Sequence, residues 1–206
     1  RLGRYNRVRS ATSPQPPFVA LNCHGVEAPI QSQTIYPDTF PFVQIAAFDP
    51  GVVNVGFRVE RRCFYQGQVY VQTVVQERLT FIADGFHYLE ASLHVLEPYR
   101  DVLSYCHYIL VESQLPVNIE AVRISQHIIT WLMIKLKGVG FKPLIIEIDP
   151  KFKSSILGAT GVRGKALKKW ASDKAIELLE RNNDPVRAQQ IRAAKKDDDM
   201  GDVVGY

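Results

Sequence analysis

Three short apolar runs, separated by longer segments that include helical periodicity, place the strongest constraint on the fold of this chain. The runs lie at residues 45–49, 107–112 and 142–149, and each ends in an acidic residue. Each has the length and apolar content of a buried strand. Because strands that are separated by helices usually pair in parallel, we expect the three runs to belong to one sheet.

Two further stretches, residues 56–65 and 69–79, are rich in Val, Phe and Tyr and alternate in part between apolar and polar residues. Gly67 lies between them, which favours a turn. Together with the first apolar run, they predict a three-stranded antiparallel meander, one face of which needs a covering layer.

Two amphipathic segments supply that layer. The first predicts a helix over residues 84–104 that begins at Asp84 and is broken or kinked by Pro98. The second predicts a helix over residues 118–137, capped by Asn118. The sequence therefore predicts an α/β chain with a five-stranded mixed sheet, three antiparallel strands plus two parallel ones, flanked by helices. This is the element order of the RNase H-like fold.

The composition changes at about residue 40. Residues 1–40 carry four early arginines, a Pro-rich run at residues 13–17 and no sustained periodicity. We interpret them as a basic, Pro-containing N-terminal arm, with one folded domain over residues 41–206. The arginines of the arm either contact nucleic-acid phosphates or belong to a solvated terminus without a partner.

Composition and cysteine spacing exclude several protein classes. The chain has 206 residues, 46% of them hydrophobic and 22% charged, which suits one globular core and excludes a wholly disordered protein. The sequence has no apolar stretch of about 18 residues, so we expect no membrane span. Its three cysteines lie far apart without a C-x-x-C spacing, which argues against a disulfide framework and a Cys-rich zinc site. We expect a reducing, intracellular compartment.

Four carboxylates form the candidate catalytic centre. Asp49 and Glu112 end two strands that are expected to be neighbours, while Asp199 and Asp202 lie three residues apart and so share one helical face. Four carboxylates around one cavity suffice for two Mg²⁺ ions roughly 3.5 to 4 Å apart, the arrangement that supports phosphodiester hydrolysis. The alternative is that both strands end at the surface and that the acidic run 197–202 is a solvated helix start.

Three segments resemble the catalytic motifs of RuvC-type Holliday junction resolvases. They are residues 48–51 with Asn54 and Gly56, residues 110–114, and residues 199–202. The resemblance covers about residues 44–206 and is greatest to the poxvirus-type branch of large DNA viruses. The chain differs from some relatives in Gly201, where a larger residue such as Ala is familiar. It also has two extra acids, Asp197 and Asp198, which leave open whether Asp198 substitutes for Asp199 as a ligand.

The resemblance implies a homodimeric, Mg²⁺-dependent endodeoxyribonuclease that cuts four-way or branched DNA, with Mn²⁺ as the alternative metal. Asp49, Glu112, Asp199 and Asp202 would be both the catalytic residues and the metal ligands. The viral resemblance further implies cytoplasmic sites of viral DNA replication. Two other functions stay open at this point: a non-catalytic nucleic-acid-binding module on an RNase H-like fold, and another nuclease of the RNase H superfamily.

A basic segment follows the last apolar run. Residues 150–174 contain seven basic residues and one acid, so the local charge is +6. The basic residues are Lys151, Lys153, Arg163, Lys165, Lys168, Lys169 and Lys174. Such a cluster beside an acidic metal site suits a DNA backbone, although a Lys-rich helix can also be a solvated face. The resemblance adds that Lys153 and Lys165 contact DNA and that Lys165 stabilises the transition state.

The aromatic and apolar residues near these motifs are predicted mainly as core. We expect Phe152 and Trp170 to pack inside, with insertion of Phe152 at a DNA junction as the alternative. Leu167 and Leu178 are predicted on the same inward face as Trp170. Residues 128, 131 and 132 of the second helix are expected in the monomer core, with a dimer interface as the alternative. We interpret His107 and His127 as structural residues.

Overall fold

The structure, a computed structural model, describes residues 41–65, 68–81, 88–138, 142–159, 161–162, 164–193 and 204. All elements below belong to the unit Phe42–Tyr206. The predicted N-terminal arm, residues 1–40, lies outside the described residues.

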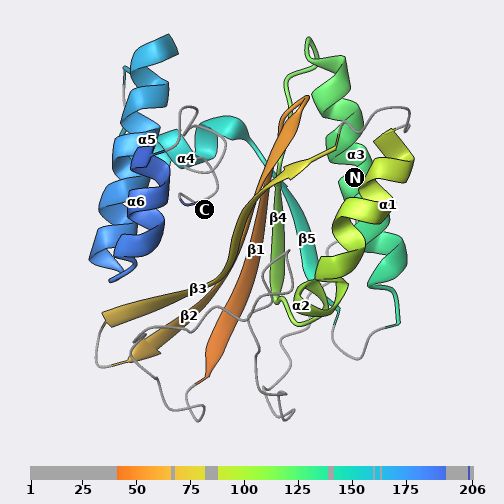
Figure 1. The fold of residues 1–206 in the computed structure, drawn as a ribbon, viewed down its shortest axis with the longest axis horizontal. Coiled ribbons are helices and arrows are strands. Elements are labelled where there is room, and N and C mark those ends of the chain that lie inside the picture. Colours follow the sequence, from red (N-terminus) through yellow and green to blue (C-terminus); the bar gives the residue numbers. More distant parts are fainter. Residues whose placement is uncertain are drawn as a thin grey trace. The chain divides into compact units, whose positions relative to one another are not determined.

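A five-stranded sheet of order β3-β2-β1-β4-β5 forms the centre of this unit (Figure 1). The strands are β1 Phe42–Pro50, β2 Asn54–Tyr65, β3 Gln68–Thr80, β4 Tyr108–Glu112 and β5 Leu144–Ile148. The first three pair antiparallel, and β1 with β4 and β4 with β5 pair parallel. The predicted mixed sheet is confirmed, including the adjacency of the two acid-ended strands.

The turn between β1 and β2 depends on glycine. The Gly51 backbone N–H donates to the Asn54 carbonyl at 2.9 Å. A Cβ at position 51 would lie 2.5 Å from that same carbonyl oxygen, so a larger residue would force the turn apart. This tight return holds β2 directly beside the end of β1, where the first candidate acid lies.

Helices lie on both sides of the sheet, with α1 and α3 on one side and α5 and α6 on the other (Figure 1). Their bounds are α1 Tyr88–Leu96, η1 Glu97–Tyr99 (a 3₁₀ turn), α2 Arg100–Ser104, α3 Ile119–Lys135, α4 Pro150–Leu157, α5 Gly164–Arg181 and α6 Pro185–Ala193. Pro98 interrupts the first predicted helix as expected, because proline has no N–H to donate to the preceding turn. Asn118 caps α3 by accepting the Ala121 N–H.

The main core lies between the sheet and α3. Phe48 of β1 stacks on Phe57 of β2 with ring centroids 4.7 Å apart, and both side chains are fully buried. Ile128, Trp131 and Leu132 of α3 are buried in the same cluster, so their predicted place in the monomer core is confirmed. In the part of the chain that the structure describes, no helix is both long and apolar enough to cross a membrane.

The prediction that Phe152 lies in the core is wrong. Its side chain is 53% exposed, and Ile156, one turn later on the same face of α4, is 65% exposed. The eight-residue helix α4 leaves the sheet beyond the edge strand β5, so this face has no layer above it in the described part of the chain.

The buried face of α5 is shifted from the predicted one. Leu178 packs against the buried cluster between α5 and α6, as predicted, but the residues buried there are Ala175 and Leu179, and Leu167 and Trp170 are only half-buried. The reason is α6, a short helix that packs against α5 and selects the face that it covers.

Candidate active site

The two strand-end acids lie side by side. Phe48 is the register partner of Val111 in the parallel pair β1–β4, so the next position along both strands places Asp49 beside Glu112. Phe48 and Val111 are fully buried in the main core, and side chains alternate along a strand. Both acids therefore project from the opposite face, where they are half-buried. Because neighbouring strands are about 4.8 Å apart, the two carboxylates can reach one cation.

The backbone around this acid pair is fixed on both flanks. On one side, Asp49 is in register with Gly56 of β2, a residue without a side chain. On the other side, the Ser113 N–H donates to the Ile148 carbonyl at 2.8 Å, which continues the β4–β5 pairing past Glu112. The acids are therefore held on rigid strands, and β2 places no side chain beside Asp49.

The donor chemistry of the acid pair suits a hard divalent cation. Carboxylate oxygens are the ligands that Mg²⁺ prefers in proteins. Asp199 and Asp202, the other two predicted ligands, lie outside the described residues, as do Asp197 and Asp198. Within the described part of the chain, no group of three or more His, Cys, Asp or Glu side chains could hold a metal ion. The described residues thus supply two of the four predicted ligands.

The basic segment begins at the same end of the sheet. Asp149 follows β5 directly, and its carboxylate caps α4 by accepting the Lys151 N–H at 2.8 Å. Because β5 pairs with β4, the first turn of α4 lies on the Glu112 side of the acid pair. Lys151 is exposed in that first turn.

The remaining predicted DNA-binding residues fall in and before α5. Lys165, Lys168 and Lys169 are exposed in the first two turns of α5. The side chain of Lys153 and the whole of Arg163 lie outside the described residues. Four of the six predicted DNA-binding side chains therefore have a described, exposed position.

Solved structures of the same architecture were found by comparison. RuvC of Thermus thermophilus matches with a TM-score of 0.54 and 11% sequence identity, covering 79% of this chain and 91% of that chain. The yeast mitochondrial Holliday junction resolvase Ydc2 matches with a TM-score of 0.55 and 14% identity, covering 81% of this chain and 79% of that chain. This chain has the RuvC-type resolvase fold. The RNase H-like fold predicted from the element order is thereby confirmed.

The remaining comparisons do not narrow the fold assignment. The fowlpox virus Holliday junction resolvase also matches, with a TM-score of 0.49 and 12% identity, covering 79% of this chain and 93% of that chain. No protein-family profile and no curated protein matches the sequence. The particular likeness to the poxvirus-type branch therefore stays a prediction.

A buried polar network, which the sequence analysis did not identify, joins the sheet of this RuvC-type fold to α6. Arg58 of β2, 2% exposed, donates from Nε to the Glu60 carboxylate at 2.8 Å and from Nη2 to the Thr73 hydroxyl at 2.7 Å. The Thr73 hydroxyl donates in turn to the Asp184 carboxylate at 2.8 Å. Burial lowers the pKa of Arg58, and the neighbouring Glu60 carboxylate opposes that shift. The signal in the sequence was the alternation of Arg58, Glu60 and Arg62 along one strand face.

The network fixes the position of α6. Asp184 is the residue before α6, and its carboxylate also accepts from Arg187 in the first turn. A small second core lies between α5 and α6 and includes Val204. Val204 lies two residues after the predicted ligand Asp202 in the sequence. The helical layer on the acid-bearing side is thus tied to the sheet by charge-assisted hydrogen bonds.

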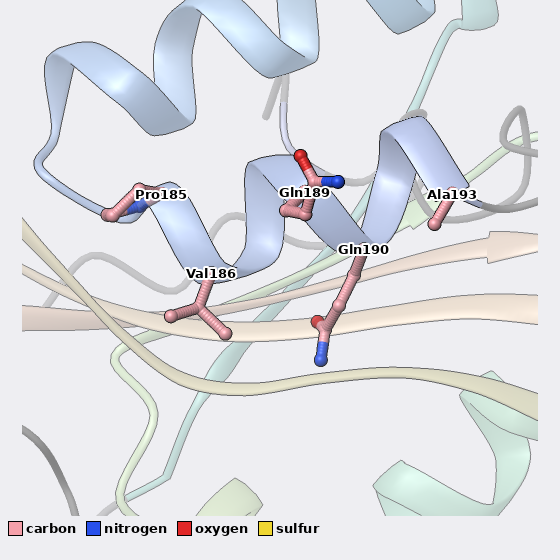
Figure 2. Close-up of a pocket in the computed structure, with 5 residues that line it drawn as sticks. All are labelled: Pro185, Val186, Gln189, Gln190 and Ala193. Carbon is pink, nitrogen blue, oxygen red and sulfur yellow. The ribbon is translucent and has the colours of Figure 1, made fainter.

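An open hollow of about 510 Å³ lies on α6. Its described lining residues, Pro185, Val186, Gln189, Gln190 and Ala193, all come from that helix (Figure 2). None of them is a predicted site residue.

Proposed function

We propose that this protein is a structure-selective DNA endonuclease that resolves four-way and branched DNA by metal-dependent phosphodiester hydrolysis. The observation that carries the proposal is the placement of Asp49 and Glu112 at adjacent positions of neighbouring parallel strands, on one face. The fold supports it, because a solved structure of similar fold is Thermus thermophilus RuvC in complex with a Holliday junction substrate, at 14% identity and a TM-score of 0.54.

The proposed metal is Mg²⁺, with Mn²⁺ as the alternative. Asp49, Glu112, Asp199 and Asp202 would hold it, with Asp198 as the alternative to Asp199. When bound, the metal would activate the attacking water and neutralise charge at the scissile phosphate. The contribution of the chain is to hold hard oxygen ligands on rigid strands, so that the phosphate is positioned against them.

Lysines and an arginine of the basic segment would bind the DNA backbone, with Lys151 in the first turn of α4 on the Glu112 side of the metal site. These residues are Lys151, Lys153, Arg163, Lys165, Lys168 and Lys169. Lys165, in the first turn of α5, would also stabilise the negative charge that develops on the phosphate. The exposure of the lysines at positions 151, 165, 168 and 169 supports this role, because exposed cations can replace the counterions of a phosphate backbone.

The proposed assembly is a homodimer, because a four-way junction offers two symmetric strands to cut. The proposed location is inside the cell. Sedimentation should give twice the monomer mass of 23.3 kDa. A monomer that produces paired, opposed cuts would contradict this assembly.

The decisive experiment compares wild-type protein with Asp49→Asn on a labelled four-way junction and on a linear duplex of matching sequence, with and without Mg²⁺. We expect paired, symmetric nicks in the junction alone. Asp49→Asn should reduce cleavage at least about a hundredfold, because it removes a metal ligand worth several kcal/mol in the transition state. Junction binding should be equal or tighter, because a charge that repels phosphate is lost.

The matched control is Asp101→Asn, which removes one charge from an exposed position on α2. It should cut like wild type. Full cleavage by Asp49→Asn would contradict the proposed site. Tight junction binding without cutting in Mg²⁺ or Mn²⁺ would favour the non-catalytic binding module, and cutting of an RNA–DNA hybrid alone would favour another RNase H-superfamily nuclease.

A further inference from the structure

One row of residues runs across the acid-bearing face of the sheet, through four strands. Glu112 of β4 lies beside Asp49 of β1, Asp49 is in register with Gly56 of β2, and Gly56 is in register with Arg78 of β3. Residues directly opposite each other in a sheet project from the same face. The next residue of β3, Leu79, is buried in the main core, which places Arg78 on the opposite, acid-bearing face.

No β2 side chain lies between Asp49 and Arg78 in this row. The two residues are separated by two strand spacings, roughly 10 Å. The residue between them is Gly56, so β2 contributes no side chain to this row. The neighbouring row toward the β1–β2 turn is polar, with the Thr80 hydroxyl 3.4 Å from the Asn54 side-chain oxygen. A polar surface therefore continues from the acid pair to β3.

Arg78 differs from the other arginine on this part of the face. Arg58 is buried and bonded to Glu60 and Thr73. The Arg78 side chain is exposed, and it makes no hydrogen bond or ion pair with another residue in the described part of the chain. It also lies on β3, at the edge of the five-stranded sheet, where an extended ligand has access.

The cations of this region lie on both sides of the acid pair. The strand order puts Arg78 on one side of Asp49, and it puts β5 with the first turn of α4, which carries Lys151, on the other side of Glu112. A backbone that crosses this end of the sheet would meet a cation, the carboxylates and a second cation in turn. Arg78 is the better suited of the two cations to grip a phosphate, because a guanidinium can donate two parallel hydrogen bonds to it.

We propose that Arg78 binds a backbone phosphate of the DNA substrate on the β3 side of the acid pair, opposite Lys151 in the first turn of α4. This inference rests on the proposed function and adds a second anchor point for the strand that is cut. The same strand would then be held on both flanks of the reacting phosphate, which restrains it better than one-sided binding.

The test measures binding of a four-way junction to the full chain in buffer without divalent metal, between about 50 and 200 mM salt. Arg78→Gln should bind roughly tenfold more weakly, as expected for the loss of one charge-assisted contact. The slope of log K against log salt should shrink by about 0.9, the value for one phosphate of duplex DNA. Arg78→Lys should keep most of the slope, because it keeps the charge.

The matched control is Arg100→Gln. Arg100 is an exposed arginine on α2. Helix α2 leads into the start of β4, whereas the acid pair lies at the other end of that strand (Figure 1). Arg100→Gln should bind the junction like wild type. Both variants should have the thermal midpoint of the wild-type protein, because both side chains are exposed.

A second measurement locates the contact. In this measurement a single phosphate of the junction is replaced by a neutral methylphosphonate. Wild type should bind more weakly when the replaced phosphate is the one that Arg78 contacts. Replacement of that same phosphate should not change the binding of Arg78→Gln. If the salt slope of Arg78→Gln equals that of Arg100→Gln, Arg78 has no role in binding. In that case the inference about Arg78 is wrong, while the proposed function is unaffected. If wild type neither binds nor cuts branched DNA, the proposed function fails and the inference fails with it.

Discussion

At the scale of single residues, His107 links three strands through its side chain and its backbone together. Its Nδ1 accepts the Gln44 backbone N–H at 3.1 Å, and its own N–H donates to the Gln44 carbonyl at 2.8 Å. Its carbonyl accepts the Leu144 N–H at 2.9 Å. His107 therefore joins β1, β4 and β5 just before β4 begins, which confirms its interpretation as a structural residue.

This arrangement predicts a pH-dependent stability. Desolvation lowers the pKa of His107, and only an unprotonated Nδ1 can accept the Gln44 N–H. The folded pKa lies below the unfolded value of about 6.5, so the unfolded state binds the proton more readily. The stabilising contribution should be complete above about pH 6.5 and should be lost as the pH falls through the folded pKa. Urea unfolding at pH 7.5 and 5.5 measures it.

His107→Asn should flatten that pH dependence, while lowering stability at the higher pH. His94→Asn, which changes an exposed histidine on α1, is the control and should leave the pH dependence unchanged. An equally steep loss of stability in His107→Asn would assign the pH dependence to other groups.

At the scale of elements, the short helix α4 depends on its cap. Asp149 accepts the Lys151 N–H at 2.8 Å, and Pro150 starts the helix, where its missing N–H costs nothing. Gly158 ends the helix with a φ of +87°, a conformation that glycine adopts readily. The cap therefore sets the direction in which the first basic residues leave the sheet.

Asp149→Ala should lower stability by about 1 kcal/mol, the usual cost of losing an N-cap. It should also weaken junction binding, because Lys151 and Lys153 belong to α4. Asn118→Ala, which removes the cap of α3, is the control: it should cost similar stability without weakening binding. Denaturant unfolding measures the loss of stability, and junction titrations measure the loss of binding. If Asp149→Ala and Asn118→Ala bind the junction equally well, α4 does not contribute to DNA binding.

Asp149→Ser should restore both properties, since serine also caps helices well. Failure of Asp149→Ser to restore binding would mean that the carboxylate has a role besides capping.

At the scale of the whole molecule, two apolar clusters are joined by a polar link. The main core lies between the sheet and α3, and the smaller one lies between α5 and α6. Thr73 is central to the link, because its hydroxyl accepts from Arg58 and donates to Asp184, 111 residues away in the sequence. Loss of that hydroxyl would leave the buried Arg58 and the partly buried Asp184 each short of one partner.

Thr73→Val should therefore lower the free energy of unfolding by about 2 kcal/mol, as measured by urea unfolding. Because the proposed ligands Asp199 and Asp202 follow α6 in the sequence, the Mg²⁺ concentration for half-maximal cleavage should also rise. Thr73→Ser should restore both values. Thr80→Val, on the same strand and at an exposed hydroxyl, should change stability by no more than about 0.5 kcal/mol.

A loss of stability in Thr73→Val without any change in the Mg²⁺ requirement would show that α6 does not position the metal site.

Local features of the sequence were sufficient to predict the strands, the helix caps and the positions of Asp49 and Glu112 at the ends of two strands. The apolar runs at residues 45–49 and 107–112 and the capping residue Asn118 carry their signals within a few positions, because strand periodicity and helix capping are local properties. For the same reason, Pro98 was correctly predicted to interrupt a helix. The sequence predicted that the strands of Asp49 and Glu112 are neighbours, but it did not predict the register that places the two residues side by side.

Tertiary structure decided the features that join distant segments. The exposure of Phe152 depends on whether a layer covers α4, and the pairing of Thr73 with Asp184 depends on where α6 lies. The alignment of Arg78 with Asp49 depends on the register of three strands, and a shift of one residue would turn the side chain to the other face. The sequence alone thus determined which elements form and where the acids occur, because those signals are local. Which side chains meet was decided only by tertiary structure, because burial and strand register are properties of the assembled sheet.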